Sequence, residues 1–349
     1  MRCVGAMSGK RSVSPARMRT LALLVVVLFV LVLATFSSAA NDNPVADASR
    51  QFEAGKYQQA AAILQAALAQ NGRQAELHYW LARCYYELGD FDRAIVSAQR
   101  AVELAPENSE YHLWLGRAYG LKAERAGWFS GFSLAKKTRQ KFEEAVRLDS
   151  SNFAAQRDLA EFYIRAPGIV GGGDDRARRQ IEALAALDSV EGHLARGEYW
   201  VDRKKPEQAE AEFRQVLEAR PKRVSPYLDV ADFYLGRNDA AHMQEAVEAA
   251  ARVNPADRRL LYYQAVARII AGNRLADAEQ LLKTYLETVP RRSDLPSHAS
   301  AREWLGRLYE RQGKCNAAVE QYRKALDSDP RSKTARDAVR RLRQCPPGE

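Results

Sequence analysis

The stretch AELHYWLARCYYELGDFDRAIVSAQRAVELAPENS, from Ala75 to Ser109, decides the fold. In it a small residue, Ala82, is followed one turn later by Tyr85, and further on by a second small residue, Ala94. Small residues let two helices approach closely, and an aromatic side chain one turn away fills the space beside them. Pro106 then ends the second helix, because proline cannot continue it. The stretch therefore predicts two antiparallel helices that pack against each other.

The close-approach residue of the first helix recurs along the chain. Its positions are separated by 34, 34, 44, 37, 34, 34 and 41 residues, and are Ala48, Ala82, Gly116, Ala160, Gly197, Ala231, Ala265 and Gly306. A second position recurs in step, at Ala60, Ala94, Thr138, Ala177, Ala209, Met243, Ala278 and Ala318. A period of about 34 residues is typical of stacked helix pairs, in which each pair buries its apolar face against its neighbours. We therefore expect an all-α solenoid.

The best-formed unit resembles the tetratricopeptide repeat (TPR) family. The positions that carry the resemblance are Leu81, Ala82, Tyr85, Gly89, Asp90, Phe91, Ala94, Ala101 and Pro106, and the unit from Ala299 to Pro330 is similar. The resemblance covers residues 41–345, with units starting near 41, 75, 109, 153, 190, 224, 258 and 299. It implies a right-handed solenoid of about eight TPR-like helix pairs that acts as an interaction scaffold for a protein or peptide partner. An apolar stripe in the last helix predicts a C-terminal cap at 332–344.

The first forty residues differ from the rest. A basic lead without acids is followed by an uncharged apolar run, Leu21–Phe36, and Ser38 and Ala40 then fit a signal-peptidase site. We predict a signal peptide at 1–40, with a retained membrane anchor as the alternative. Both place the repeats outside the cytoplasm, either periplasmic or anchored to the inner membrane and facing the periplasm. The sequence leaves open whether translation starts at Met1 or Met18.

Loss of that lead removes most of the net charge. The chain carries +9, and +4 remains without Arg2, Lys10, Arg11, Arg17 and Arg19. Because the remaining charge is mixed along the repeats, we expect no nucleic acid partner.

His78 and His112 have no second ligand at metal spacing on their own helices, and no HExxH, CxxC or Ser-His-Asp pattern is present. We expect no enzyme activity, metal or cofactor, and the oligomeric state stays open.

The resemblance also implies a concave groove, lined by the first helices, in which equal positions of successive units form columns. Two residues before the small position the column contains Ala46, Trp80, Trp114, Asp158, Ala195, Asp229, Tyr263 and Trp304. One residue after it the column contains Ser49, Arg83, Arg117, Glu161, Glu198, Asp232, Val266 and Arg307. The groove is thus expected to be aromatic and basic in units two and three, acidic in units four to six, and aromatic and basic again at its end.

From these columns we predict a set of groove residues that bind the partner: Trp80, Arg83, Trp114, Arg117, Glu161, Glu198 and Asp232. Tryptophan and arginine are enriched at binding hot spots. The alternative is that the tryptophans pack between helices and the arginines neutralise neighbouring glutamates.

The long intervals mark two insertions, AGWFSGFS at Ala126–Ser133 and APGIVGGG at Ala166–Gly173. We expect two loops that lie side by side, with Trp128, Phe129 and Phe132 on the first. Loops that depart from a repeat often carry function, so the aromatic loop is predicted to dock a partner or to touch the membrane. These loops support a second hypothesis, a membrane-tethered assembly or secretion accessory factor. The alternative is a local mini-core formed with the glycine loop.

Two cysteines near the C-terminus are candidates for a disulfide. Cys315 is expected to begin the last second helix, and Cys345 to end the terminal helix. Antiparallel neighbours bring such ends together, so we predict a Cys315–Cys345 bond in an oxidising compartment, with two free thiols as the alternative.

Overall fold

The computed structural model describes residues 43–342, and within that range it contains α-helices, one 3-10 helix and no strand. The first helix of each pair is α2 (Pro44–Glu53), α4 (Ala75–Glu87), α6 (Ser109–Arg125), α8 (Phe153–Arg165), α10 (Ser189–Asp202), α12 (Ser225–Gly236), α14 (Arg259–Ala271) or α16 (His298–Arg311). The second is α3 (Tyr57–Gln70), α5 (Phe91–Leu104), α7 (Trp128–Leu148), α9 (Asp174–Leu187), α11 (Pro206–Glu218), α13 (Ala240–Val253), α15 (Leu275–Thr288) or α17 (Cys315–Ser328). The 3-10 helix η1 (Gly168–Val170) precedes α9, and α18 (Lys333–Arg341) packs on α17.

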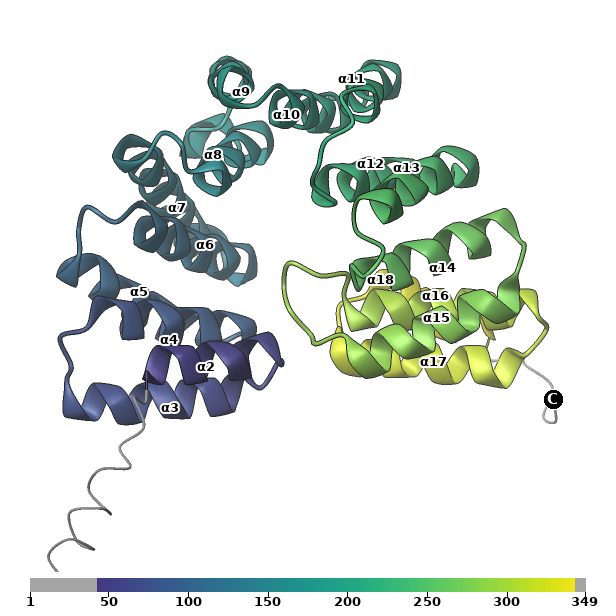
Figure 1. Ribbon diagram of the computed structural model, residues 1–349, viewed down its shortest axis with the longest axis horizontal. Coiled ribbons are helices and arrows are strands. Elements are labelled where there is room, and N and C mark those ends of the chain that lie inside the picture. Colours follow the sequence, from purple (N-terminus) through teal and green to yellow (C-terminus); the bar gives the residue numbers. More distant parts are fainter. Residues whose placement is uncertain (1–42, 343–349) are drawn as a thin grey trace, which may run out of the picture.

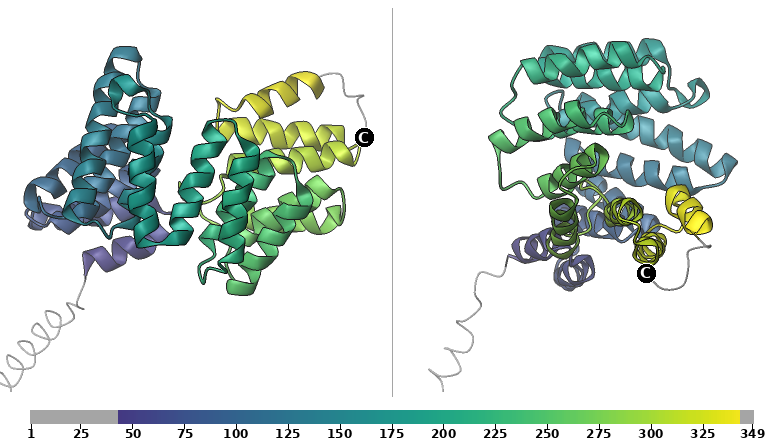
Figure 2. Two further views of the ribbon diagram at one scale, coloured as in Figure 1. Left: turned by 90° about the horizontal axis from the view of Figure 1, so that it is seen from above. Right: turned by 90° about the vertical axis from the view of Figure 1, so that its right-hand side faces the viewer.

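The pairs follow one another round an almost closed ring (Figure 1). Each even-numbered helix packs on its partner and also on the even-numbered helix of the next pair, whereas the odd-numbered helices lie further apart. The even-numbered helices therefore form the inner, concave layer, and the odd-numbered helices form the outer layer. The succession of helix pairs can also be followed from above and from the side (Figure 2). The all-α solenoid predicted from the repeat is confirmed.

The recurring small residues lie where the two helices of a pair meet. All are buried, and at three of them glycine is required by an aromatic ring of the second helix. A Cβ added at Gly116 would lie 2.5 Å from Phe142 Cε1, one at Gly197 would lie 2.6 Å from Phe213 Cζ, and one at Gly306 would lie 2.7 Å from Tyr322 Cζ. Where alanine holds the first position, the facing residue is aliphatic: Leu64, Ala98, Ile181, Val247 or Leu282. Volume is thus balanced within each pair of helices.

This balance predicts an energetic coupling between Gly197 and Phe213. Gly197→Ala should lower the free energy of unfolding by about 1–3 kcal/mol, because its methyl group overlaps the Phe213 ring. In a Phe213→Leu background the same change should cost about 1–2 kcal/mol less, because leucine leaves room for the added methyl group. Urea unfolding of the four proteins, followed by circular dichroism, measures this coupling. Additive effects of the two changes would contradict it.

The predicted loop at Ala126–Ser133 is wrong, because the insertion lengthens helices. The helices α6 and α7 have 17 and 21 residues, against 13 and 14 in α4 and α5. Only Ala126 and Gly127 connect them, and Gly127 caps α7 in an extended conformation. Gly131 is accommodated inside the helix, so glycine did not mark a loop here.

The second insertion does form a connection between α8 and α9, built around η1. Gly171 and Gly173 have φ values of +100° and +127°, a conformation that favours glycine. The connection packs on the middle of α7: a Cβ on Gly171 would lie 2.8 Å from Arg139 Cδ. Arg139 lies about three turns along the helix from Trp128, so the contact differs from the predicted mini-core with the aromatic residues.

The ring is closed by the connection between α15 and α16, residues 289–297, which we call the clasp loop. Glu87, at the end of α4, accepts hydrogen bonds from Ser293 N (2.9 Å) and Ser293 Oγ (2.7 Å). The Tyr57 hydroxyl donates to the Arg291 carbonyl, and Arg292 forms an ion pair with Glu53. The clasp loop therefore joins the seventh and eighth pairs to the first and second.

Two sequence predictions lie wholly or partly outside the described residues. The signal peptide or anchor at 1–40 is outside them, and so is Cys345, so the disulfide with Cys315 stays a prediction. Over residues 43–342, none of the helices combines the length and the apolar character needed to cross a membrane.

Candidate functional site

The inner surface brings the predicted tryptophan and arginine residues of units two and three together. The Arg83 guanidinium lies 4.3 Å from the ring centroid of Trp80 and 4.8 Å from that of Trp114. Arg83 also donates to the Tyr79 hydroxyl at 3.2 Å, and Trp114 Nε1 donates to Glu110 at 2.8 Å. These side chains stack on one another between α4 and α6, as the packing alternative requires of the tryptophans, but Arg83 forms no ion pair with a glutamate within residues 43–342. Partner binding by them stays a prediction.

Arg117 connects this aromatic cluster to the next unit. Its guanidinium lies 4.9 Å from the Trp114 ring centroid and binds Asp158 through two hydrogen bonds of 2.6 and 3.3 Å. Burial alone would lower the pKa of Arg117, but the Asp158 carboxylate outweighs it and raises this pKa. Arg117 is therefore a charged link between the basic and the acidic part of the inner surface.

The acidic centre of the inner surface consists of Glu161, Glu191, Glu198, Asp229 and Asp232, and Glu191, Glu198 and Asp229 lie around Arg157. Arg157 nitrogens lie 3.0 Å from Asp229, 3.5 Å from Glu191 and 3.9 Å from Glu198. Burial would lower the pKa of Arg157, but these carboxylates together raise it. Glu161 pairs with Arg165 of its own helix at 2.7 Å. Arg157 is thus the cation around which helices α8, α10 and α12 meet.

Sequence reasoning missed Arg157 because it lies outside the two columns that were compared. Its own column, three residues before the small position, contained the necessary signal. The other members are Val45, Tyr79, Leu113, Leu194, Leu228, Tyr262 and Glu303, so apolar and aromatic residues predominate. An arginine in such a column, between two units rich in acids, indicates a charge that is neutralised from neighbouring helices.

Two carboxylates of the acidic centre are poorly neutralised. Burial within the concave surface raises the pKa of Glu198 to about 7, against the opposing effect of Arg157 and with added repulsion from Glu161 and Asp229. Burial likewise raises the pKa of Asp232 to about 6, although Asp232 accepts a hydrogen bond from the Tyr263 hydroxyl at 2.8 Å. A cation from a partner would relieve both groups.

A cavity of about 510 Å³ adjoins the acidic centre between the long α6–α7 pair and α8. Apolar surface is provided by Tyr86, Leu121 and Phe162, and the rim carries Arg117 and Arg165. Such a mixed lining suits a side chain that has an apolar stem. The inserted turns of the α6–α7 pair contribute to this cavity, and the columns alone do not predict it.

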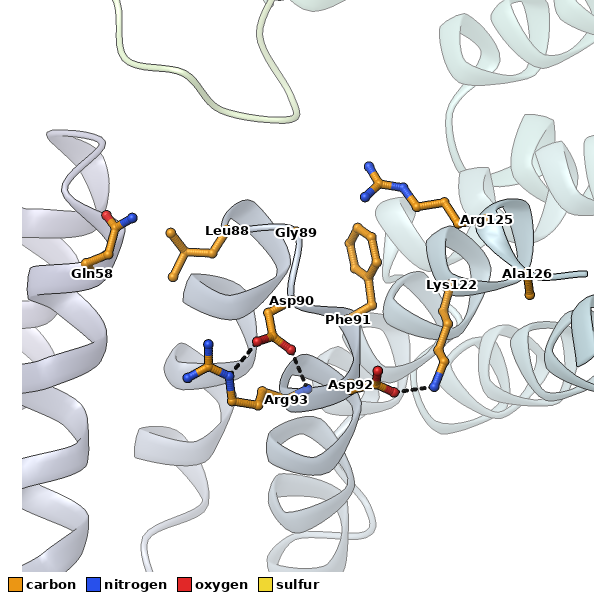
Figure 3. Close-up of a pocket in the computed structure, with 10 residues that line it drawn as sticks. All are labelled: Gln58, Leu88, Gly89, Asp90, Phe91, Asp92, Arg93, Lys122, Arg125 and Ala126. Carbon is orange, nitrogen blue, oxygen red and sulfur yellow. Dashed lines mark hydrogen bonds and ion pairs between the residues drawn. The ribbon is translucent and has the colours of Figure 1, made fainter. Parts of the chain in front are cut away.

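A second hollow, of about 760 Å³, lies at the turn between α4 and α5, and Figure 3 shows its lining. Four of its charged groups are paired, Asp90 with Arg93 at 2.5 Å and Asp92 with Lys122, and the Arg125 guanidinium lies 4.5 Å from the Phe91 ring centroid. Gly89, with φ +74°, makes the turn from α4 to α5. Because most of its charges are paired and it lies away from the columns, we do not assign this hollow to partner binding.

The aromatic residues of the inserted segment are exposed at the start of α7. Trp128 is 80% exposed and Phe129 is 89% exposed, and Ile169 of the glycine connection is 68% exposed. Phe132 is half-buried, with Lys136 Nζ lying 4.4 Å from its ring centroid. The helix start thus presents two large apolar side chains to solvent.

No group of three or more histidine, cysteine, aspartate or glutamate side chains is arranged to hold a metal ion among residues 43–342. Cys84 is buried in α4, and burial raises the pKa of its thiol to about 12.

Comparison with known proteins identifies the repeat. Models of the tetratricopeptide repeat match residues 51–119 and 291–333, and no curated protein matches the chain. The structure of yeast Tom70 is similar with a TM-score of 0.57 and 16% identity, over 82% of this chain and 58% of that one. A thermophilic TPR protein of Thermus thermophilus is 22% identical with a TM-score of 0.46, over 56% of this chain and 100% of its own. A tetratricopeptide repeat protein from Parabacteroides merdae is 16% identical with a TM-score of 0.46, over 77% and 98%. This chain thus spans under two thirds of the Tom70 structure, and that likeness shows the fold alone.

Proposed function

Because this chain is a tetratricopeptide repeat protein, we propose that it is a non-catalytic protein–protein interaction scaffold of the cell envelope that binds a partner segment in its concave groove. The repeat supports the scaffold role, since proteins of this fold generally bind protein partners. The apolar run Leu21–Phe36, after a basic lead, supports the envelope location.

The acidic centre carries the groove proposal. Glu198 lies 3.9 Å from Arg157, beyond hydrogen-bond distance, and Asp232 forms no ion pair within residues 43–342. Carboxylates that are held in a concave surface without full neutralisation favour a ligand that supplies positive charge. We therefore expect the partner segment to place a lysine or arginine side chain over Glu198 and Asp232.

The test is capture of envelope proteins by the full chain, compared with a Glu198→Lys, Asp232→Lys variant. Charge reversal at both positions should weaken binding of the captured partner by roughly 10- to 100-fold, and binding of the wild type should decrease with added salt. The matched control is Glu207→Lys with Glu248→Lys, the same charge change on exposed positions of α11 and α13. Equal capture by the two variants would disprove binding at the acidic centre.

A second candidate is a membrane-tethered assembly or secretion accessory factor that acts through the inserted segments 126–133 and 166–173. Its support is the exposure of Trp128, Phe129 and Ile169, which the stability of the repeat does not require. The candidates predict different sensitivities, because Trp128→Ala with Phe129→Ala should abolish an assembly interaction and leave groove binding unchanged.

A further inference from the structure

The inserted segment makes the α6–α7 pair project beyond its neighbours. Counted from the small residue, α6 ends four residues later than α4, and α7 begins seven residues earlier relative to Thr138 than α5 does relative to Ala94. At 1.5 Å per residue the two extensions amount to about 6 and 10 Å, and both lie at the turn that joins the helices. We call this turn and its flanking residues, 122–137, the hairpin tip.

Aromatic side chains occupy the outermost part of the hairpin tip. Trp128 and Phe129 are 80% and 89% exposed, and both begin α7. Phe132 lies four residues after Trp128 and three after Phe129, so the three aromatic residues share one face of the helix. No cavity surrounds Trp128 and Phe129 among the described hollows, so they form a protrusion rather than a lining.

Basic side chains share the hairpin tip with the aromatic residues. The hairpin tip contains Lys122, Arg125, Lys136 and Lys137, and Glu124 is its one acid. Lys122 pairs with Asp92, but Arg125, Lys136 and Lys137 form no ion pair within residues 43–342. Lys136 Nζ lies 4.4 Å from the Phe132 ring centroid and Lys137 Nζ lies 5.4 Å from that of Tyr119, so both ammonium groups stay close to the helix surface.

We infer that the hairpin tip binds an anionic phospholipid bilayer, with Trp128 and Phe129 in the lipid interface and Arg125, Lys136 and Lys137 on headgroup phosphates. The inference deepens the second candidate function and rests on it, because it names the membrane as what the inserted segment touches. Tryptophan and phenylalanine next to lysine and arginine are the residues that favour the bilayer interface. Each basic residue near an anionic surface adds to the affinity.

A lipid surface fits these observations better than a protein partner does. Lysine is depleted in protein interfaces, whereas it is favoured beside anionic headgroups. The aromatic residues protrude from the longest helix pair instead of lining a pocket, as insertion into a soft interface requires. The apolar run Leu21–Phe36, outside the described residues, would also hold the chain at a membrane if it is the retained anchor of the alternative prediction.

The test is photo-crosslinking of the full chain with p-benzoylphenylalanine in place of Phe129. The chain is reconstituted with vesicles of phosphatidylethanolamine and phosphatidylglycerol, irradiated and analysed by mass spectrometry for a phospholipid adduct on residue 129. We expect such an adduct, and roughly tenfold less of it with phosphatidylcholine alone or with Lys136→Glu and Lys137→Glu. The matched control places the same probe at Val96, which is 65% exposed on α5 and should give no lipid adduct.

Each remaining outcome has a defined meaning. Equal lipid adducts at residues 96 and 129, or an adduct that ignores lipid charge, would overturn the inference. Irradiation of native membranes distinguishes failure of lipid binding from failure of the second candidate function. A protein adduct or a chain dimer at residue 129 without lipid would keep the assembly candidate and disprove lipid binding. No adduct at residue 129 in vesicles or membranes would reject both. The Glu198→Lys, Asp232→Lys variant should form the lipid adduct normally, so the lipid test does not depend on whether a partner binds in the groove.

Discussion

Replacing Arg157 by glutamine should lower the free energy of unfolding by about 2–4 kcal/mol at pH 8. Arg157 is surrounded by Asp229, Glu191 and Glu198, at N–O distances of 3.0, 3.5 and 3.9 Å. Glu191 is only 3% exposed, so loss of the cation leaves this carboxylate with few polar partners, although the Arg157 side chain is 34% exposed and water can enter part of the space that it leaves. Arg223, which donates to Glu191 at 2.8 Å, keeps part of the neutralisation. The loss should therefore lie at or below the usual cost of breaking a buried ion pair from one side.

The loss should become smaller as the pH falls from 8 to 5. In the wild type, burial raises the pKa of Glu198 to about 7 although Arg157 opposes this rise. The variant lacks Arg157, so nothing from that residue opposes the rise there. A carboxyl group with a higher pKa in the folded than in the unfolded chain binds its proton more tightly when folded. Stability is therefore gained as the pH falls through the folded pKa and lost as it rises. At pH 5 Glu198 is neutral and no longer repels Asp229, so the deficit should fall to about half.

Urea unfolding of the full chain at both pH values, followed by circular dichroism, measures these effects. The matched control is Arg165→Gln, because Arg165 is on the same helix and its side chain is 65% exposed and paired with Glu161. It should cost less than about 0.5 kcal/mol at either pH, as surface pairs usually do. A deficit of the Arg157 variant that is no larger than that of the control would show that Arg157 is not a structural cation.

The helix pairs could be predicted from the sequence because their requirement is local. Two helices that cross closely need a small residue at the crossing, and Gly197 and Gly306 are small for a reason that lies within their own unit, the facing Phe213 and Tyr322 rings. The columns also placed Glu161, Glu198 and Asp232 on one inner surface, since equal positions stack when units repeat.

Features that depend on contacts beyond the local sequence could not be predicted in the same way. The segment 126–133 contains Gly127, Gly131 and Ser130, which locally favour a turn, yet packing of the long α6–α7 pair makes most of it helical. The contact between Glu87 and Ser293 depends on the rotation summed over all intervening units, which no single unit specifies. Its one sequence signal is the interval of 41 residues between Ala265 and Gly306, which contains the clasp loop.

Removing the hydrogen bonds of the clasp loop should open the ring. The test combines Glu87→Ala, which deletes the acceptor of both Ser293 bonds, with Tyr57→Phe, which deletes the hydroxyl that binds the Arg291 carbonyl. Phenylalanine keeps the buried Tyr57 ring in place, so the first helix pair should remain folded. Bonds to a charged acceptor are worth about 1.5–3 kcal/mol and the neutral one about 1 kcal/mol, so the ratio of closed to open rings should fall roughly 100-fold or more.

Small-angle X-ray scattering of the full chain measures this opening as a larger radius of gyration. The control is Glu103→Ala, because Glu103 is on the second helix pair and has an exposed ion pair with Arg100 alone. That variant should scatter like the wild type. The Arg292–Glu53 pair remains in the double variant, but it is exposed on the Glu53 side and adds little. If the double variant keeps the wild-type radius of gyration, the stacking of the repeats alone closes the ring and the hydrogen bonds of the clasp loop do not contribute.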